Sequence, residues 1–165
     1  MLSDHFEASR KAFKPVRVDV LFVGESRPSG GTFFYQGDSN LFRETKKAFD
    51  EYFGQNIFSL DAFKDWNCWL YDICKNPVNC LDDEAREDEI QRNMPCLEKC
   101  VGSENPKYIV ICKRGAVRAA VSLSSIMSKY RENETLFFLP FPSNGRQKEY
   151  REGLVGALTT MDFTP

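Results

Sequence analysis

The sequence lacks several features that identify whole classes of protein. No run of apolar residues approaches the roughly 18 that a transmembrane helix needs, so no membrane partner is expected. The first residues contain no apolar stretch typical of a secretory signal, which predicts a cytoplasmic location and reduced cysteines. The glycine-rich phosphate-binding patterns GxGxxG and GxxxxGK followed by Ser or Thr are both missing. Their absence argues against a nucleotide-phosphate binder built on such a loop.

Metal-binding residues are scarce or badly spaced. His5 is the only histidine, and the six cysteines include no CxxC pair. Because cysteine is among the most buried residue types, buried structural thiols are the expectation, and no metal or other cofactor is predicted. The alternative is a four-cysteine zinc site formed by Cys74, Cys80, Cys96 and Cys100.

A net positive charge is also missing. The formal net charge is −2, whereas proteins that bind nucleic acid mainly through its phosphates usually carry a basic face. A local basic rim remains an alternative to ordinary solvated charges, if loops bring together Lys113, Arg114, Arg118, Arg146 and Lys148.

Hydrophobic patterning predicts strands that alternate with helices. The near-continuous apolar run Val18–Val23 is typical of a central parallel strand that is covered on both faces. Three further strands are predicted at Leu70–Cys74, Lys107–Cys112 and Leu136–Leu139. Helices are predicted at 4–13, 39–53, 61–67, 82–101, 116–130 and 149–158, with a kink at Pro95 and an end at Gly102. This order predicts a single domain over 1–165, a three-layer α/β/α sandwich with a mainly parallel four-stranded sheet.

The carboxyl ends of these strands should share one edge of the sheet. Ligands of such folds bind outside that edge. The segments expected there are Gly24–Tyr35, Asp72–Asn76, Lys113–Gly115 and Pro140–Arg146.

The motifs at this edge resemble the uracil-DNA glycosylase superfamily. Gly24-Glu25-Ser26-Arg27-Pro28 is similar to its first motif, which is followed by an aromatic residue and an apolar helix. The stretches LYDICKNP, EIQRNMPCL and NPKYIVICKRGA are similar to the branch that carries an iron–sulfur cluster. The stretch LPFPSNGR is closer to the last motif of the mismatch-specific uracil/thymine glycosylases. The resemblance implies a uracil-DNA glycosylase-like fold and a DNA partner.

The chain departs from this family at positions that carry chemistry. Asn76 and Asn93 stand where the cluster branch has cysteines, so no iron–sulfur cluster is expected. Phe141 stands in the last motif where many members have a histidine that stabilises the departing base. Backbone N–H groups and Ser143 are left to take over that role.

The base-binding residues follow from the resemblance. Phe34 is the candidate for stacking on a flipped-out base, with Phe33 or Tyr35 replacing it if the register slips. At least one of the three should face outward, because side chains alternate along an extended segment. Asp72 stands where the family reads uracil with Asn, and Gly24 lies beside the base.

An ionised Asp only accepts hydrogen bonds, so it should repel O4 of uracil and favour an edge with amino or imino donors. Activity on plain uracil is therefore expected to be weak or absent. The alternative for Asp72 is a loop acid without a role in binding.

Glu25 is the candidate for positioning the hydrolytic water, with Asp72 as the other possible base. Ser26 stands at the position of the family's catalytic Asp or Asn, and Ser143 completes the catalytic set. The candidates for DNA contact are Arg27, Ser143, Asn144, Gly145 and Arg146, although Arg146 is alternatively an exposed cation at a helix start.

These observations predict a monomeric DNA glycosylase-like protein. It would hydrolyse the N-glycosidic bond of a flipped-out damaged or deaminated base. The alternative is a nucleobase- or nucleic-acid-binding protein on the same fold, without catalysis.

Overall fold

Four parallel strands form the central sheet, in the order β2-β1-β3-β4. The computed structural model describes residues 2–165, with side chains from residue 5 onward. The strands are β1 (Val20–Gly24), β2 (Cys68–Asp72), β3 (Tyr108–Ile111) and β4 (Leu136–Phe138). The α-helices are α1 (Leu2–Ala12), α2 (Asn40–Phe53), α3 (Leu60–Asp65), α4 (Asp83–Glu104), α5 (Ala116–Leu123), α6 (Ser128–Glu132) and α7 (Gln147–Thr160). Two 3-10 helices are η1 (Phe34–Gln36) and η2 (Ser125–Met127).

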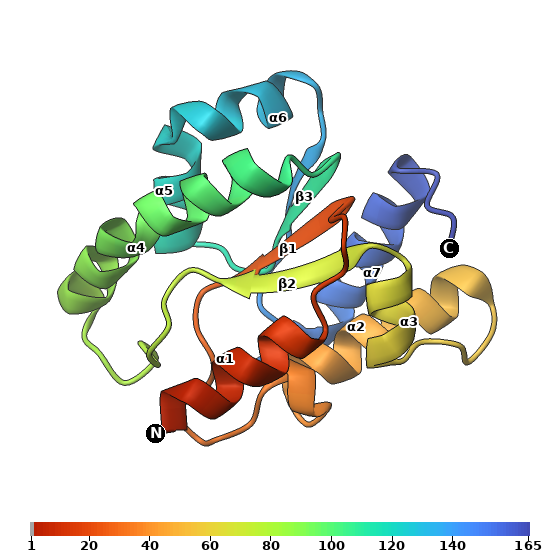
Figure 1. The fold of residues 1–165 in the computed structure, drawn as a ribbon, viewed down its shortest axis with the longest axis horizontal. Coiled ribbons are helices and arrows are strands. Elements are labelled where there is room, and N and C mark those ends of the chain that lie inside the picture. The colour runs from red at the N-terminus through yellow and green to blue at the C-terminus, as the bar shows by residue number, and fades with distance from the viewer. Residues whose placement is uncertain (1) are drawn as a thin grey trace.

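Helices cover both faces of the sheet (Figure 1). Helix α2 packs on α7 on one face, and α4 packs on α5 on the other. Helix α1 lies alongside the outer strand β2, where the indole Nε1 of Trp69 donates to the carbonyl of Arg10 at 3.2 Å. This arrangement confirms the predicted α/β class and the four-stranded parallel sheet. Among the described residues, no helix has the length and apolar character needed to cross a membrane.

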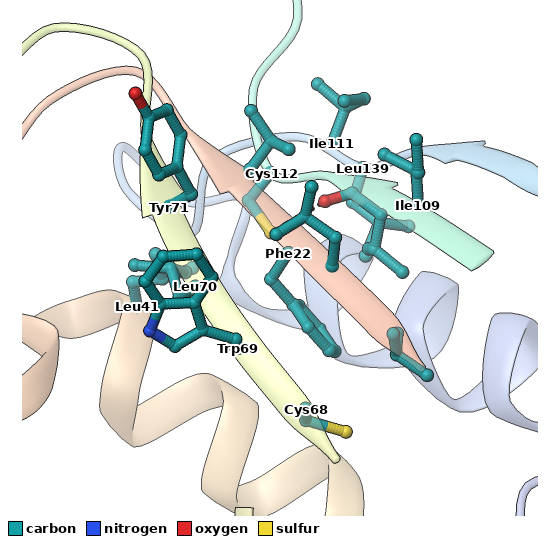
Figure 2. Packing of buried hydrophobic residues seen from close by; sticks show 14 of the residues in the cluster. Phe22, Leu41, Cys68, Trp69, Leu70, Tyr71, Ile109, Ile111, Cys112 and Leu139 are labelled. Carbon is teal, nitrogen blue, oxygen red and sulfur yellow. Dashed lines mark hydrogen bonds between the residues drawn. The ribbon is translucent and has the colours of Figure 1, made fainter. Parts of the chain in front are cut away.

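The core forms because the central strands are apolar on both faces. All five residues of β1 are buried, and β2 and β3 are almost as fully buried. Figure 2 shows Phe22 of β1 on one face of the sheet and Ile109 and Ile111 of β3 on the other, as the register of the two strands requires. Such double coverage explains the continuous apolar runs in the sequence.

Several helix boundaries follow the predicted capping residues. Ser39 accepts from the backbone N–H of Phe42 at 3.1 Å, and Gly54 adopts a left-handed conformation after α2. The predicted stop at Gly102 is wrong, because α4 continues to Glu104 and ends at Asn105, which has a φ of 46°. Pro95 lies within α4, which continues past it to Glu104.

The predicted single helix over 116–130 is wrong. Ser124 adopts an extended conformation, and its hydroxyl donates to Oε1 of Glu98 on α4 at 2.5 Å. The chain therefore divides into α5, η2 and α6. A serine that bonds to a neighbouring helix in this way competes with helix continuation.

Strand β2 begins and ends two residues earlier than predicted. Its register places Asp72 opposite Gly24 at the ends of β2 and β1. The next two residues still bond to the β1 side, since the N–H groups of Ile73 and Cys74 donate to the carbonyls of Gly24 and Glu25 at 3.0 and 2.8 Å. This pairing holds the two predicted carboxylates, Asp72 and Glu25, at the same edge of the sheet.

Candidate functional site

A cleft opens where the strand order reverses, between the carboxyl ends of β1 and β3. This position is the topological switch point, where doubly wound sheets bind their ligands. The cleft has a volume of about 330 Å³. We call it the central cleft, and its lining residues are Glu25, Ser26, Arg27, Pro28, Asn79, Arg86, Lys113, Phe141, Ser143 and Asn144.

Glu25 is buried at the base of the central cleft and is held by two cations. It is 7% exposed. Arg86, in the first turns of α4, donates from Nε to Oε2 at 3.1 Å and from Nη2 to Oε1. Nζ of Lys113 lies 3.7 Å from Oε1. Because Arg86 donates to both oxygens, Glu25 holds cations at the cleft in this structure.

The pKa values of the two cations move in opposite directions. The hydrogen bond to Glu25 raises the pKa of Arg86. Burial lowers the pKa of Lys113, and the charge of Glu25 opposes this effect. Three cationic side chains, including Arg27, line the central cleft against one carboxylate. The cleft therefore attracts an anion, although the whole chain carries a net negative charge.

Ser26 and Asn79 fix the loops around the central cleft. The Ser26 hydroxyl accepts from the backbone N–H of Val78 at 3.2 Å. Asn79 donates from Nδ2 to the Ser29 hydroxyl at 3.0 Å and accepts from the Ser29 N–H at 3.2 Å. These bonds connect the loop after β1 to the loop after β2. In this structure Ser26 therefore acts as a loop anchor at the wall of the cleft.

The segment after β4 forms the opposite wall. Ser143 and Asn144 line the cleft, and Lys113 Nζ lies 5.3 Å from the ring centroid of Phe141. Asn144 and Gly145 both adopt left-handed conformations, with φ of 51° and 82°. Gly145 and Arg146 are exposed and do not line the cleft.

Asp72 lies outside the central cleft, against the end of β1. A Cβ atom at Gly24 would come within 2.2 Å of Asp72 Oδ1, so a side chain at position 24 would require the carboxyl group to move. Burial, with a smaller contribution from Glu25, raises the pKa of Asp72 to about 7, and Arg10 and Arg27 oppose the rise. No hydrogen bond from the described residues contributes to this pKa. Asp72 is thus a carboxyl group without a hydrogen-bond partner and with a pKa near neutral pH.

The three aromatic residues after the glycine loop all belong to the core. Phe33, Phe34 and Tyr35 are each at most 4% exposed, so the expectation that one faces outward is wrong. The segment folds as the 3-10 helix η1 rather than as an extended chain, which removes the alternation.

Phe34 and Tyr35 have structural contacts in place of the predicted stacking surface. The Phe34 ring lies 5.8 Å from Phe42 and 5.4 Å from Phe63, centroid to centroid. The hydroxyl of Tyr35 donates to the carbonyl of Leu70 at 3.0 Å and accepts from its N–H at 2.6 Å. Tyr35 thereby satisfies backbone groups on the outer edge of β2.

Phe34 and Asp72 share a second, very small cavity of about 20 Å³, the inner cavity. Its other lining residues are Ser26, Arg27, Pro28, Phe33, Ser39, Leu41, Leu70 and Phe141. Glu25 and Ser143 line the central cleft instead, so the four key predicted residues do not line one pocket. A nucleobase requires the inner cavity to widen.

A third cavity, the α1 pocket, lies between α1 and the end of β2. It has a volume of about 170 Å³ and is lined by Phe6, Glu7, Arg10, Arg27, Phe33, Tyr71, Asp72, Cys74 and Lys75. Arg27 lines all three cavities. This pocket could not be predicted from the sequence, because α1 carries no motif and its place beside β2 depends on tertiary packing.

Arg86 was also missed, since it is one of many charged residues at the start of α4. The basic rim, which the sequence left as an alternative to ordinary solvated charges, forms only in part. Lys113 reaches the central cleft, but Arg114 pairs with Glu149 at 2.7 Å and Lys148 with Glu152 at 3.6 Å.

The cysteines are free thiols in different environments. Cys68, Cys74 and Cys112 are buried, whereas Cys80 and Cys96 are exposed, so the expectation of buried thiols is wrong for those two. Within residues 5–165, no three His, Cys, Asp or Glu side chains gather in a way that could hold a metal ion.

Comparisons with known proteins add no family to this description. The chain matches none of the protein-family models, and no curated protein is similar to it. The function must therefore be argued from the site itself.

Proposed function

We propose that this chain is a DNA glycosylase-like protein that binds one nucleotide of DNA at the carboxyl edge of its sheet. The phosphate lies in the central cleft, and the base lies against Asp72. The observation that carries this proposal is the pairing of an anion-attracting cleft with an unpartnered carboxyl group at adjacent strand ends. The uracil-DNA glycosylase-like motifs support the same assignment, and their fold is part of the proposal.

The phosphate is bound by Arg86 and Lys113. Guanidinium and ammonium groups are the common donors to phosphate oxygens. Glu25 holds both cations toward the cleft, so it serves as a positioning residue. Arg27 and Asn144 complete the contact surface at the rim.

The base is read by Asp72. With a pKa of about 7, this carboxyl is partly protonated at neutral pH and mostly ionised at pH 8 and above. The ionised form repels O4 of uracil, and the protonated form offers one donor and one acceptor, as Asn does. Binding of plain uracil is therefore weak at pH 8 and increases as the pH falls below 7.

Hydrolysis uses Asp72 as the base, because a pKa near the working pH suits proton transfer. The bond between C1′ and the base nitrogen breaks, and the base leaves with the electron pair. A water adds its oxygen to C1′ and gives a proton to the Asp72 carboxylate.

A second candidate function is binding without hydrolysis. One observation favours it: Arg86 occupies both carboxylate oxygens of Glu25, the residue expected to orient water.

A base-release screen separates the two functions. Oligonucleotides with a panel of damaged and deaminated bases are incubated at pH 6 and pH 8, beside a DNA-binding titration. Release that an Asp72→Asn variant alters supports hydrolysis, and binding without release for every base supports the second function. A chain that neither binds nor releases contradicts both.

A further inference from the structure

Flat side chains that contact one another line the α1 pocket. The guanidinium carbon of Arg27 lies 4.3 Å from the ring centroid of Phe6, and the rings of Phe6 and Phe33 meet edge to face at 5.2 Å. Bases in protein sites stack on aromatic rings or on arginine planes. The pocket, at about 170 Å³, is smaller than sites for drug-sized ligands, roughly 300–1,000 Å³, so it suits a small flat ligand.

The polar groups of the pocket divide into engaged and available side chains. Arg10 is partly engaged, because Nε donates to Glu7 Oε2 at 3.1 Å and Nη2 to Oε1 at 2.5 Å, while Nη1 is buried without a partner among the described residues. Asp72 has no hydrogen-bond partner among the described residues. Nε of Arg27 is likewise buried without a partner there. Lys75 is exposed at the pocket.

A ligand that satisfies these groups must present donors to a carboxylate and acceptors to nearby cations. Guanine does both: its N1–H and 2-amino group are adjacent donors, and O6 and N7 are acceptors that arginine and lysine recognise. Adenine and cytosine offer the carboxylate a single amino group, and uracil offers one imino donor between two acceptors. Only guanine can make a bidentate contact with Asp72 while meeting the cations.

We propose that the α1 pocket binds a guanine base, held by Asp72 at its donor edge and by Arg27 and Lys75 at its acceptor edge. The inference rests on the proposed function only for the source of the base, a nucleotide of DNA. It places the base on the α1 side of Asp72 and names its class.

Guanine binding should depend on pH, because the bidentate contact needs an ionised carboxyl. The groups around Asp72 come from every neighbouring element: Glu7 and Arg10 on α1, Glu25 after β1, Arg27 in the next loop, Tyr71 on β2, and Cys74 and Lys75 after it. Burial is the main cause of the raised pKa of Asp72. Affinity for guanosine therefore increases as the pH rises from 6 to 8.

Titration with the four free nucleosides tests this assignment, followed by amide chemical shifts or calorimetry. Guanosine should bind at least about fivefold more tightly than adenosine, cytidine or uridine at pH 8. Asp72→Asn should weaken guanosine binding at least fivefold and remove its pH dependence, and Arg27→Met should weaken it as well. Asp88→Asn, an exposed change on α4, is the matched control and should bind as the wild type.

Three results would overturn the inference: no binding of guanosine, equal binding of the four nucleosides, or unchanged binding by Asp72→Asn. A DNA titration in parallel keeps the two proposals distinct. DNA binding without guanosine selectivity contradicts the guanine pocket alone. Guanosine selectivity without DNA binding supports the pocket and contradicts the proposed function.

Discussion

The raised pKa of Asp72 predicts that Asp72→Asn stabilises the fold at alkaline pH. Between its ordinary value of 3.8 and about 7, the carboxyl is protonated in the folded chain and ionised in the unfolded chain. The folded state then binds more protons, so the free energy of unfolding falls as the pH rises through this window. Above pH 7 the carboxyl is ionised in both states, and the folded chain then carries the full free-energy cost of holding the charge in a buried site. Asparagine is neutral at every pH, so the Asp72→Asn variant does not carry this cost.

The magnitude follows from the two pKa values. Each pH unit corresponds to about 1.36 kcal/mol, so the total penalty on the wild type approaches about 4 kcal/mol at pH 8. Between pH 5 and pH 8 the stability of Asp72→Asn relative to the wild type should increase by about 2–3 kcal/mol. Any effect of the amide on packing is the same at both pH values, and the comparison removes it.

Urea unfolding at pH 5, 6, 7 and 8 measures this difference for both chains. Asp88→Asn is the control, since that exposed carboxyl has no buried environment, and its difference from the wild type should stay constant. If the difference in free energy of unfolding between Asp72→Asn and the wild type is also constant from pH 5 to pH 8, the reasoning is refuted. Such a result would mean that Asp72 is ionised throughout that range.

Three further changes test the contacts that build the site, each by urea or thermal unfolding. Glu25→Ala leaves Arg86 without its partner and should lower the free energy of unfolding by about 2 kcal/mol, between the values for exposed and fully buried ion pairs. Gly24→Ala places a methyl group against Asp72 and should destabilise the fold by about 1–3 kcal/mol. Tyr35→Phe removes the hydroxyl that bonds the edge of β2 and should lower stability by about 1–3 kcal/mol.

Each of these changes has a control elsewhere in the chain. Glu149→Ala breaks an exposed pair and should change stability by at most about 1 kcal/mol. Gly156→Ala lies in α7, where a Cβ meets open space, and should stabilise by about 0.5–1 kcal/mol. Tyr52→Phe removes a half-buried hydroxyl bond to the Phe163 carbonyl and should have a smaller effect than Tyr35→Phe. If a change and its control alter the free energy of unfolding equally, the contact that the change removes does not have the stabilising role described.

Much of the fold was predictable because its signals are local. The apolar run that becomes β1 has buried residues on both faces, and Ser39 and Gly54 mark the ends of α2 as expected. The errors arose where tertiary contacts override local preference. Ser124 leaves the helical conformation as it bonds to Glu98, and Asn105 rather than Gly102 ends α4.

The site was only partly predictable for the same reason. Parallel strands bring the loops after their carboxyl ends to one edge, so that edge could be predicted from alternation, whereas the place of the cleft between β1 and β3 depends on strand order. The ion pair of Glu25 with Arg86 joins residues 61 positions apart, and no local pattern indicates it. The burial of Phe34 follows from the 3-10 helix, which the glycine-rich loop did not suggest.

The central claim is that one nucleotide binds at the carboxyl edge of the sheet, with its base against Asp72. An amide chemical-shift titration with a short single-stranded oligonucleotide containing guanine tests it most directly. We expect shifts at Gly24–Arg27, Asp72–Lys75 and Lys113 together, with the residues around Lys107 and Asp19 at the opposite edge unchanged. No shifts, or shifts confined to that opposite edge, would contradict the claim.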